Sequence, residues 1–398
     1  MTRQFVKDTI ISGFARSEVG RRLYRSSLEL TIDACLAAIA DAGLTPADID
    51  GLITWPDETA GGAGSGFGNP SVSTMQDTLG LNLEWYVTGG LDGLNVTGSV
   101  IDACMAVATG LARHVLVYRT VTEASAQSTR RRAPSVGGGA QRTGGWQQWV
   151  APYAAASAGN WAALSAQRHF HEYGTTPEQL GAIAVGQRTN AGLNPDAIYR
   201  DPMTLDDYLS SPVISTPIRM FDCDIAADGA HAFIISRADY ATDAPRPAIR
   251  FEAVAASRHG YASWIYREDQ TTMASHDAGA RLWRETDLRP GDVDIAQLYD
   301  GFSIFVLLWL EALGFCEKGE SGPFVEGGAR IALDGDLPVN TGGGQLSEGR
   351  YLGWGALYEA CLQLRGDAGE RQVKKSDVGI VTGGGGNIAQ VFLLSRHR

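Results

Sequence analysis

The chain has 398 residues, 44% of them hydrophobic and 20% charged, which is the composition of a globular protein with a large core. Its formal net charge of −12 argues against a nucleic-acid or anionic-membrane surface, because either would need a positively charged face. Five scattered cysteines without a CxxC pair, no signal-like amino terminus and no run of ~18 apolar residues favour a cytoplasmic protein without disulfides, zinc ligands or a membrane span.

The first predicted unit is a helix, a proline-led turn and a buried strand. It ends in LTPADIDGLI at residues 44–53, where Pro-x-Asp-x-Asp precedes an apolar run. Residues 97–109 are small and apolar and predict a helix buried between sheets. Residues 114–118 (HVLVY) predict a short central strand. Together these elements indicate an alternating α/β arrangement.

Residues 124–218 are rich in Gly, Ser, Ala, Trp and Pro and predict an inserted loop region with its own helices. Four aromatic residues are expected to form a private core for this region: Trp146, Trp149, Tyr153 and Trp161. The region also holds the one dense basic cluster of the sequence, Arg130, Arg131 and Arg132. Two interpretations stay open for that cluster, a solvated loop or a site for the phosphates of a cofactor such as coenzyme A.

The second half of the chain repeats the opening pattern. Residues 232–236 (AFIIS) predict a strand, and LRPGDVDIAQL at residues 288–298 then echoes residues 44–53 at a distance of about 244 residues. VGIVTGGGGNIAQVFLLS at residues 378–395 predicts the last strands and a glycine turn. The pattern indicates two copies of one α/β unit in a layered fold whose strands are buried on both faces.

Six segments resemble the thiolase superfamily, and specifically its sterol-carrier-protein-type branch. They are NPDAIYRDPMT (194–204), ADGAHAFIIS (227–236), DVDIAQLYDGFS (292–303), EALGFCEKGE (311–320), PVNTGGGQLSEGRYLGWGALYEA (338–360) and TGGGGNIAQ (382–390). The resemblance implies an α/β thiolase fold, with two similar βαβαβαββ halves in a five-layer αβαβα arrangement, and a homodimer. It places the amino-terminal half at residues 1–123 and 219–244, an inserted loop domain at 124–218 and the carboxy-terminal half at 245–398.

The sequence departs from the thiolase pattern at every catalytic position. Thiolases use a cysteine nucleophile at the amino end of a buried helix, a histidine in Gly-His-Pro, an Asn or His before an xxF element, and a second cysteine. The matching positions here are Asn95 (or Gly93), Tyr351 in Gly349-Arg350-Tyr351, Tyr299 in Tyr-Asp-Gly-Phe, and Val381. Cys104 lies further along the helix and is interpreted as a core residue. An acyl-enzyme through sulfur is therefore not expected.

The glycines of the thiolase site are retained although its nucleophile is lost. They are Gly342, Gly343, Gly344, Gly349, Gly353, Gly383, Gly384 and Gly385. The resemblance implies that the backbone N–H of Gly383 points at a thioester oxygen, where an oxyanion-hole donor supplies ~2.7–4 kcal/mol. Such a donor matters only where an anion forms, and this favours a changed chemistry over a dead site.

A retro-aldol cleavage needs an enolate pocket and acid/base groups but no nucleophile. We assign the acid/base roles to Tyr299 and Tyr351, the alternative being that both pack an inert pocket. Arg350 is expected to lower the pKa of a phenol, or else to form a structural ion pair. Asp300 is expected to orient Tyr299 or hold a water, or else to cap a strand end.

Three further residues are assigned to the pocket. Asn95 is expected to line the former nucleophile site. Trp354 replaces a small family residue and is assigned, with Gly344, to substrate binding. No metal site is expected in this chain, and no cofactor other than the coenzyme A carried by the substrate.

The Tyr-Asp-Gly-Phe and Gly-Arg-Tyr-Leu-Gly-Trp-Gly stretches resemble the bacterial aldolases once called lipid-transfer proteins. That resemblance implies cleavage of a 17-hydroxy steroid side-chain thioester to a 17-ketosteroid and propionyl-coenzyme A. It also implies a small partner protein with an oligonucleotide-fold domain and a zinc ribbon, which would carry the zinc. Two alternatives stay open: an inert acyl-CoA-binding or scaffold subunit, and an enzyme that runs the same chemistry in the condensing direction.

Overall fold

The structure is a computed structural model that describes residues 4–57, 66–89, 97–129, 145–155, 157–258 and 263–397. Its strands are β1 (Thr9–Arg16), β2 (Gly51–Thr54), β3 (Trp85–Thr88), β4 (His114–Thr122), β5 (Val213–Ser215), β6 (Ile218–Arg219), β7 (Asp228–Arg237), β8 (Ile249–Arg258), β9 (Ile295–Gln297), β10 (Val378–Gly384) and β11 (Ile388–Arg396). Its helices are α1 (Ser27–Asp41), α2 (Val72–Leu79), α3 (Gly98–Ala108), α4 (Glu123–Thr129), α5 (Gln147–Val150), α6 (Ala158–Tyr173), α7 (Pro177–Gly192), α8 (Leu205–Ser210), α9 (Ala274–Leu282), α10 (Ser303–Ala312), α11 (Ser321–Val325), α12 (Gly344–Ser347) and α13 (Trp354–Arg365).

The strands form a mixed nine-stranded sheet in two halves, in the order β3-β2-β4-β7-β1-β8-β11-β10-β9. The halves meet where β1 pairs with β8 through Ile10↔Arg250 and Ile11↔Ile249. In the first half β2 runs parallel to both β3 and β4, and in the second half β9 runs parallel to β10. The two halves therefore follow the same plan.

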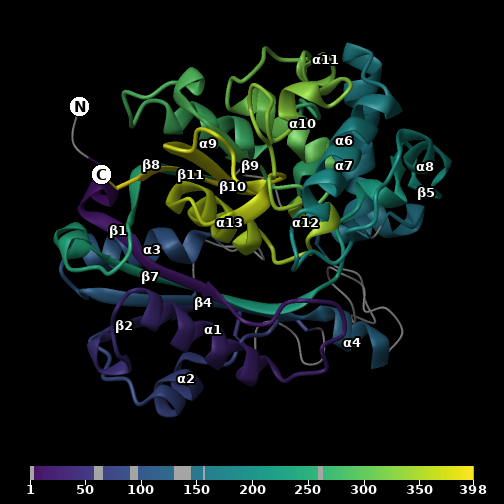
Figure 1. Cartoon of the computed structure of the whole chain (residues 1–398). Coiled ribbons are helices and arrows are strands. Elements are labelled where there is room, and N and C mark those ends of the chain that lie inside the picture. Colours follow the sequence, from purple (N-terminus) through teal and green to yellow (C-terminus); the bar gives the residue numbers. More distant parts are fainter. Residues whose placement is uncertain are drawn as a thin grey trace.

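Helices cover both faces of each half and produce five layers (Figure 1). Helix α1 packs on β1, β4 and β7, α3 and α13 lie between the two halves of the sheet, and α9 packs on β8 and β11. Three apolar clusters fill the gaps: one under α1, one around α3 and α13, and one under α9 and α10. The central cluster draws on both halves, so it holds them together through burial of apolar surface.

The sequence echo is confirmed, and its aspartates have matching contacts in the two copies. The first aspartate of each copy accepts the backbone N–H of the residue before the proline: Asp48 accepts from Thr45 at 2.8 Å, and Asp292 from Arg289 at 2.7 Å. The second, Asp50 or Asp294, accepts two backbone N–H groups at the start of the neighbouring parallel strand, β4 or β10. Pro-x-Asp-x-Asp thus caps a turn and fixes strand register.

The other predicted elements are found, some with different ends. Helix α3 matches the prediction for residues 97–109, while the strands predicted at 114–118 and 232–236 are longer, as β4 and β7. The described residues between β4 and β7 contribute helices and the β5–β6 hairpin but no strand to the nine-stranded sheet, and the boundary predicted at residue 218 falls inside β6.

The expected private core of the insertion is right for one aromatic pair and wrong for the other. Trp161 is buried and packs on Trp146 with ring centroids 4.9 Å apart. Trp149 on α5 and Tyr153 in the turn that follows it are 67% and 82% exposed. Across the described residues, no helix has the length and apolarity to cross a bilayer, and no group of three or more His, Cys, Asp or Glu is placed to hold a metal ion.

Candidate active site

The candidate site lies where β9 ends, beside the glycine turn at residues 340–355. Parallel strands bring their carboxyl ends to one edge of a sheet, and side chains that follow them converge there. The amide of Asn340 fixes this junction, because its Oδ1 accepts the backbone N–H of Leu298 at 2.7 Å and its Nδ2 donates to the Leu298 carbonyl at 3.0 Å. The backbone N–H of Tyr299 donates to Thr382 Oγ1 at 2.7 Å, which ties the site to β10.

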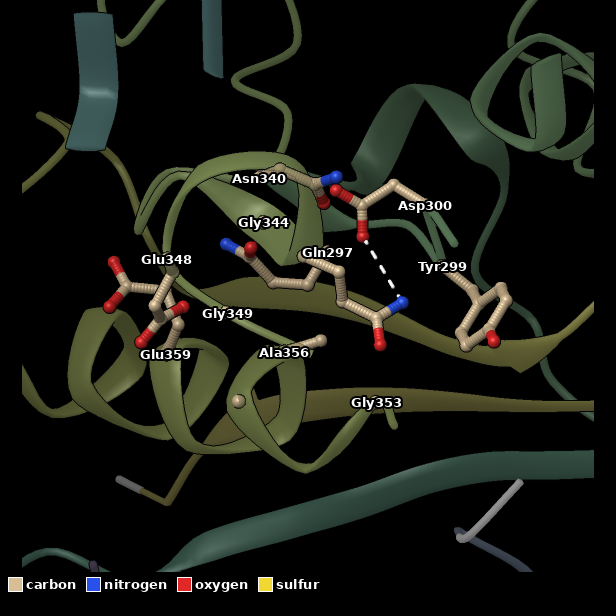
Figure 2. Close-up of a pocket in the computed structure, with 12 residues that line it drawn as sticks. Gln297, Tyr299, Asp300, Asn340, Gly344, Glu348, Gly349, Gly353, Ala356 and Glu359 are labelled. Atoms are coloured by element: carbon tan, nitrogen blue, oxygen red, sulfur yellow. Dashed lines mark hydrogen bonds between the residues drawn. The ribbon is translucent and has the colours of Figure 1, made fainter. Parts of the chain in front are cut away.

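A small polar pocket occupies this junction. It is lined by Gln297, Tyr299, Asp300, Asn340, Gly344, Gln345, Glu348, Gly349, Gly353, Gly355, Ala356 and Glu359. Figure 2 shows Tyr299 and Asp300 on one side of the pocket and the carboxyl groups of Glu348 and Glu359 on the opposite side. Glycines from the turn line the pocket along with these polar side chains, and none of the cysteines in the described part of the chain lines it.

Asp300 is a carboxyl group in this pocket that is suited to proton transfer, and it lies on the same side as Tyr299 (Figure 2). It is 2% exposed, and burial raises the pKa of its carboxyl to about 7. The backbone N–H of Leu346 approaches its Oδ2 at 3.4 Å and the Gln345 amide approaches Oδ1 at 3.5 Å, and both contacts favour the carboxylate (Figure 2). A general base works best when its pKa lies near the working pH. From the sequence we expected Asp300 to orient Tyr299 or hold a water, or else to cap a strand end. Its burial depends on distant segments, so its raised pKa was not foreseen.

Tyr299 lines the pocket next to Asp300, but its electrostatics differ from expectation. Burial raises its pKa above the ordinary value, and Asp224 raises it further, while Arg350 and a hydrogen bond from Gln345 act in the opposite direction. The expected lowering of the pKa is therefore not found, because desolvation outweighs the cation. Tyr299 is a neutral phenol at pH 7 and is suited to donate a proton or a hydrogen bond.

Tyr351 lies behind the glycine turn and does not line the pocket. Its ring is 1% exposed and sits against the edges of Gly349 and Gly355, two residues that do line it. Burial raises its pKa, and no residue in the described ranges hydrogen-bonds its hydroxyl. Its ring also faces His231, with centroids 4.9 Å apart. The structure thus places Tyr299 in the pocket and Tyr351 against the glycine turn that lines it.

Arg350 forms the structural ion pair that was the alternative interpretation. Its guanidinium binds Glu123, with Nε 2.9 Å from Oε2, and its Nη1 lies 3.0 Å from Asp224 Oδ1. Although Tyr351 is next in sequence, the phenol pKa on which Arg350 acts is that of Tyr299. The side chain of Arg350 points toward Glu123 of α4 and toward Asp224. Burial raises the pKa of Tyr299, and Arg350 lowers it.

Three other assigned positions are placed as follows. The missing side chain of Gly383 faces Thr97 Oγ1 and Gln390 Oε1, two buried atoms that have no hydrogen-bond partner among the described residues. Gly344 lies in the pocket wall. Trp354 is fully buried in the central core, where its ring packs on Phe233, rather than in the pocket wall. Asn95, Arg130, Arg131 and Arg132 lie outside the described residues.

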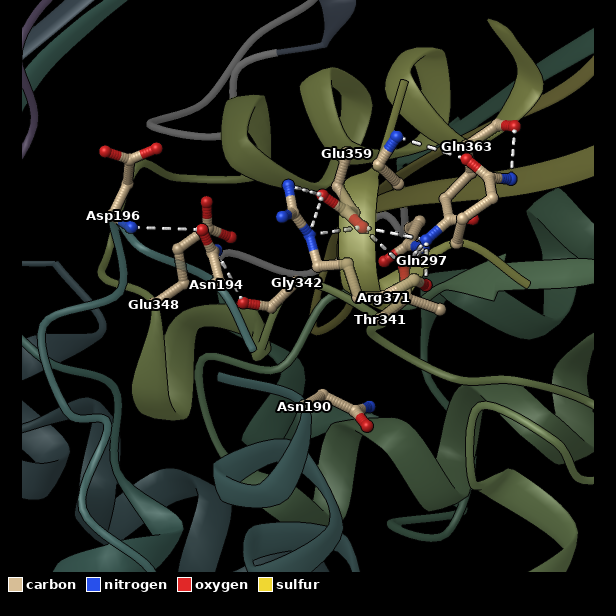
Figure 3. Close-up of polar contacts among 12 residues, drawn as sticks. Asn190, Asn194, Asp196, Gln297, Thr341, Gly342, Glu348, Glu359, Gln363 and Arg371 are labelled. Carbon is tan, nitrogen blue, oxygen red and sulfur yellow. Dashed lines mark hydrogen bonds and ion pairs between the residues drawn. The ribbon is translucent and has the colours of Figure 1, made fainter. Parts of the chain in front are cut away.

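The acidic side of the pocket was missed by the sequence analysis. Burial raises the pKa of Glu348 to about 7 although its Oε1 lies 3.0 Å from Arg16. Glu359 is held by Arg371 and by the hydroxyl of Thr341, which itself accepts from Gln297 (Figure 3). These hydrogen bonds connect the glycine turn, through Thr341, to β9 and α13. Arg16 and Glu348 are 332 residues apart in sequence, so only the position of Glu348 inside the glycine motif hinted at this pair.

Comparisons with known proteins match nearly the whole chain. The family described as thiolase C-terminal domain-like matches residues 256–395. The chain is 34% identical to the steroid side-chain-cleaving aldolase of Thermomonospora curvata over 98% of each sequence. It is 34% identical to the 17-hydroxy-3-oxo-4-pregnene-20-carboxyl-CoA lyase of Mycobacterium tuberculosis, over 89% of this chain and 91% of that one. The solved structure of an Ltp2-ChsH2(DUF35) aldolase superposes with a TM-score of 0.86 and 32% identity over 99% of each chain.

Proposed function

The chain belongs to the thiolase superfamily, and from that premise we propose that it is a retro-aldolase that cleaves a β-hydroxyacyl-CoA thioester. The substrate is a 17-hydroxy steroid side-chain thioester, and the products are a 17-ketosteroid and propionyl-CoA. The observation that carries the proposal is Asp300: a buried carboxyl with a pKa of about 7 stands beside a neutral phenol in a pocket without a thiol among its described lining residues. The names of its relatives in T. curvata and M. tuberculosis support the same chemistry.

The reaction moves one proton and breaks one carbon–carbon bond. The Asp300 carboxylate takes the proton of the β-hydroxyl, the C–O bond becomes a carbonyl, and the electrons of the Cα–Cβ bond pass to the thioester as an enolate. The N–H of Gly383 and the hydroxyl of Thr97 stabilise the enolate oxygen. Tyr299 then protonates Cα, and the proton held by Asp300 returns to the phenolate. No water is consumed, and both groups regain their starting states.

A thioester supports this route better than a simple ester or an acid, because its enolate is the more stable anion. Sulfur chemistry in the protein is not required. Burial raises the pKa of the Cys104 thiol to about 12, so a thiolate is scarce at neutral pH. The cysteine sits in the central core within α3, as the sequence indicated.

We extend the proposal to the assembly. The solved Ltp2-ChsH2(DUF35) aldolase is named for two components, and by analogy this chain acts as a homodimer together with a small partner that has an oligonucleotide-fold domain and a zinc ribbon. Arg130, Arg131, Arg132 and Asn95 are kept as proposed contacts to coenzyme A and to the reacting end of the substrate. A cytoplasmic location is part of the same proposal.

The direct test incubates the purified chain, with and without such a partner, with β-hydroxyacyl-CoA thioesters. Release of a ketone and a shorter acyl-CoA in equal amounts is the expected result. An inert acyl-CoA-binding or scaffold subunit would bind the thioester and release neither product, and that outcome would overturn the proposal.

Tyr299→Phe is expected to lower kcat/KM for cleavage about 10²-fold, the lower end for loss of an acid/base group, because water can replace the phenol as proton donor. Tyr351→Phe is expected to leave kcat/KM within about 3-fold of wild type, since the ring that packs against Gly349 and Gly355 is retained and the hydroxyl lies outside the pocket. The same change should raise stability by about 1 kcal/mol, because it removes a buried hydroxyl without a partner in the described structure. An unchanged rate for Tyr299→Phe would remove that tyrosine from the mechanism, and a loss above about 10-fold for Tyr351→Phe would show that its hydroxyl takes part.

Cys104→Ala is expected to leave kcat/KM within about 3-fold of wild type, while a small buried cavity costs about 1 kcal/mol of stability. Steady-state cleavage and urea denaturation of the same preparation check both parts. A loss of more than 10²-fold in rate, without unfolding, would point to a thiol mechanism and would contradict the retro-aldol proposal.

A further inference from the structure

Gln187 is a buried amide that the proposed mechanism leaves unused. It lies on α7, is 2% exposed, and neither its Oε1 nor its Nε2 has a hydrogen-bond partner among the described residues. Gln345 Oε1 is in the same situation. A buried polar group without a partner costs about 1–3 kcal/mol. Two such amides at one place point to a ligand that supplies their hydrogen bonds.

Gln345 follows Gly344 in the chain, and Gln187 and Asp300 approach each other at the face of Gly344 where a side chain would lie. A Cβ atom at this position would lie 2.1 Å from Asp300 Oδ2, 2.7 Å from Gln187 Oε1 and 3.0 Å from Asn340 Nδ2. Gly344 also has φ of +59°, which side-chain-bearing residues rarely adopt. The missing side chain therefore lets Asp300 Oδ2 and Gln187 Oε1, two acceptor atoms, come close to each other at the backbone, and Gln345 reaches the other carboxyl oxygen of Asp300.

The chemistry of this space matches a hydroxyl group. A hydroxyl donates one hydrogen bond and accepts others, and here a carboxylate accepts while an amide offers both a donor and an acceptor. Asn340 Oδ1 and one N–H of its Nδ2 are engaged by Leu298, and the second N–H of Nδ2 is a further donor beside Gly344. When the hydroxyl becomes a carbonyl during cleavage, the protonated Asp300 and the amide N–H groups can all donate to it.

We infer that Gln187 and Gln345 form, with Asp300, a subsite that recognises the β-hydroxyl of the substrate and selects hydroxyacyl over unsubstituted acyl thioesters. The inference rests on the proposed function and adds its specificity determinants. A site built to hydrogen-bond a hydroxyl discriminates against an analogue that lacks it, because its buried polar groups then stay unpaired. Gln187 comes from α7 in the inserted region, so that region would contribute to substrate choice.

The test measures binding of two stable CoA analogues, one β-hydroxyacyl and one unsubstituted, in which an amide nitrogen replaces the thioester sulfur so that neither is cleaved. Wild type is expected to bind the hydroxy analogue about 10-fold more tightly, which is the size of one good hydrogen bond. Gln187→Met should reduce this preference to less than about 2-fold and leave the affinity for the unsubstituted analogue unchanged.

Gln179→Met is the matched control, because Gln179 is buried on the same helix but its amide has partners in Thr176 and Glu326. This variant is expected to lose stability and keep the 10-fold preference. The inference is overturned if Gln187→Met keeps the preference, or if wild type has none. Thioester cleavage is assayed separately. A preference for the hydroxy analogue without cleavage would contradict the proposed function but not the hydroxyl subsite.

Discussion

Asp300→Asn is expected to abolish most of the cleavage activity, with kcat/KM about 10³- to 10⁴-fold below wild type. The substitution preserves size and can still accept the hydrogen bond from the backbone of Leu346. It removes the ability to take the hydroxyl proton, for which the pocket offers no equally placed replacement, since Glu348 lies on its far side (Figure 2). Initial rates of ketone formation at substrate concentrations below KM measure kcat/KM for both proteins. A loss below 10-fold would show that another group is the base.

The pH profile gives a second, independent readout of the same residue. The base must be ionised, and burial raises the Asp300 pKa to about 7. Wild-type kcat/KM is therefore expected to rise tenfold per pH unit below about pH 7 and to level off above it. The residual activity of Asp300→Asn should lack this inflection. A wild-type profile that is flat between pH 5 and pH 8 would contradict the assignment.

The contribution of Asp300 to stability should fall over the pH range in which its contribution to activity rises. The rise of the Asp300 pKa from 3.8 to about 7 means that the folded protein holds a proton which the unfolded chain has already lost in that interval. Stability then falls as the pH rises from about 4 to about 7, by on the order of 4 kcal/mol from this group alone. Asp300→Asn should remove this dependence and unfold at equal or higher urea concentration at pH 8. Loss of activity without loss of stability would show that Asp300 acts in the reaction and is not needed for folding.

The fold was largely predictable because its signals are local. Pro-x-Asp-x-Asp identified the repeat, and the structure explains why: each aspartate acts on backbone groups of its own turn or of the adjacent strand start. Glycine and apolar patterns located α3, β10 and β11 in the same way. These features depend on residues near in sequence, or on a repeated unit.

The site was only partly predictable because its electrostatics depend on long-range packing. Tyr299 and Asp300 were found from their motif, but the direction of their pKa shifts follows from burial. The partner of Arg350, Glu123, is 227 residues away, and no sequence pattern links them. Gln187 carries no motif, and only its place beside Gly344 gives it a role. Burial raises the pKa of Tyr299 and Arg350 lowers it, whereas the pKa of Tyr351, the sequence neighbour of Arg350, depends on burial, Glu348 and Arg16.

Arg350→Met is expected to lower the free energy of unfolding by about 3–5 kcal/mol. The side chain of Arg350 is 16% exposed and neutralises two carboxylates, Glu123 at 3% and Asp224 at 12% exposure. Methionine fills a similar volume but leaves both acids charged in a poorly solvated place. Breaking a buried pair costs far more than the pair contributes, because the remaining charge loses its compensation. Urea denaturation at pH 7 and low salt measures the difference.

Arg237→Met provides the matched control, since Arg237 and Asp239 form an ion pair whose side chains are 53% and 68% exposed. Solvent screens such a pair, so its loss should change stability by less than about 1 kcal/mol. Adding Glu123→Gln to Arg350→Met should recover part of the loss, because one unpaired charge disappears with it. Equally small losses of stability for Arg350→Met and Arg237→Met would show that Glu123 and Asp224 are stable without the charge of Arg350. Arg350 would then have to be explained through its action on Tyr299, and its variant would show a changed pH profile of cleavage instead of a changed stability.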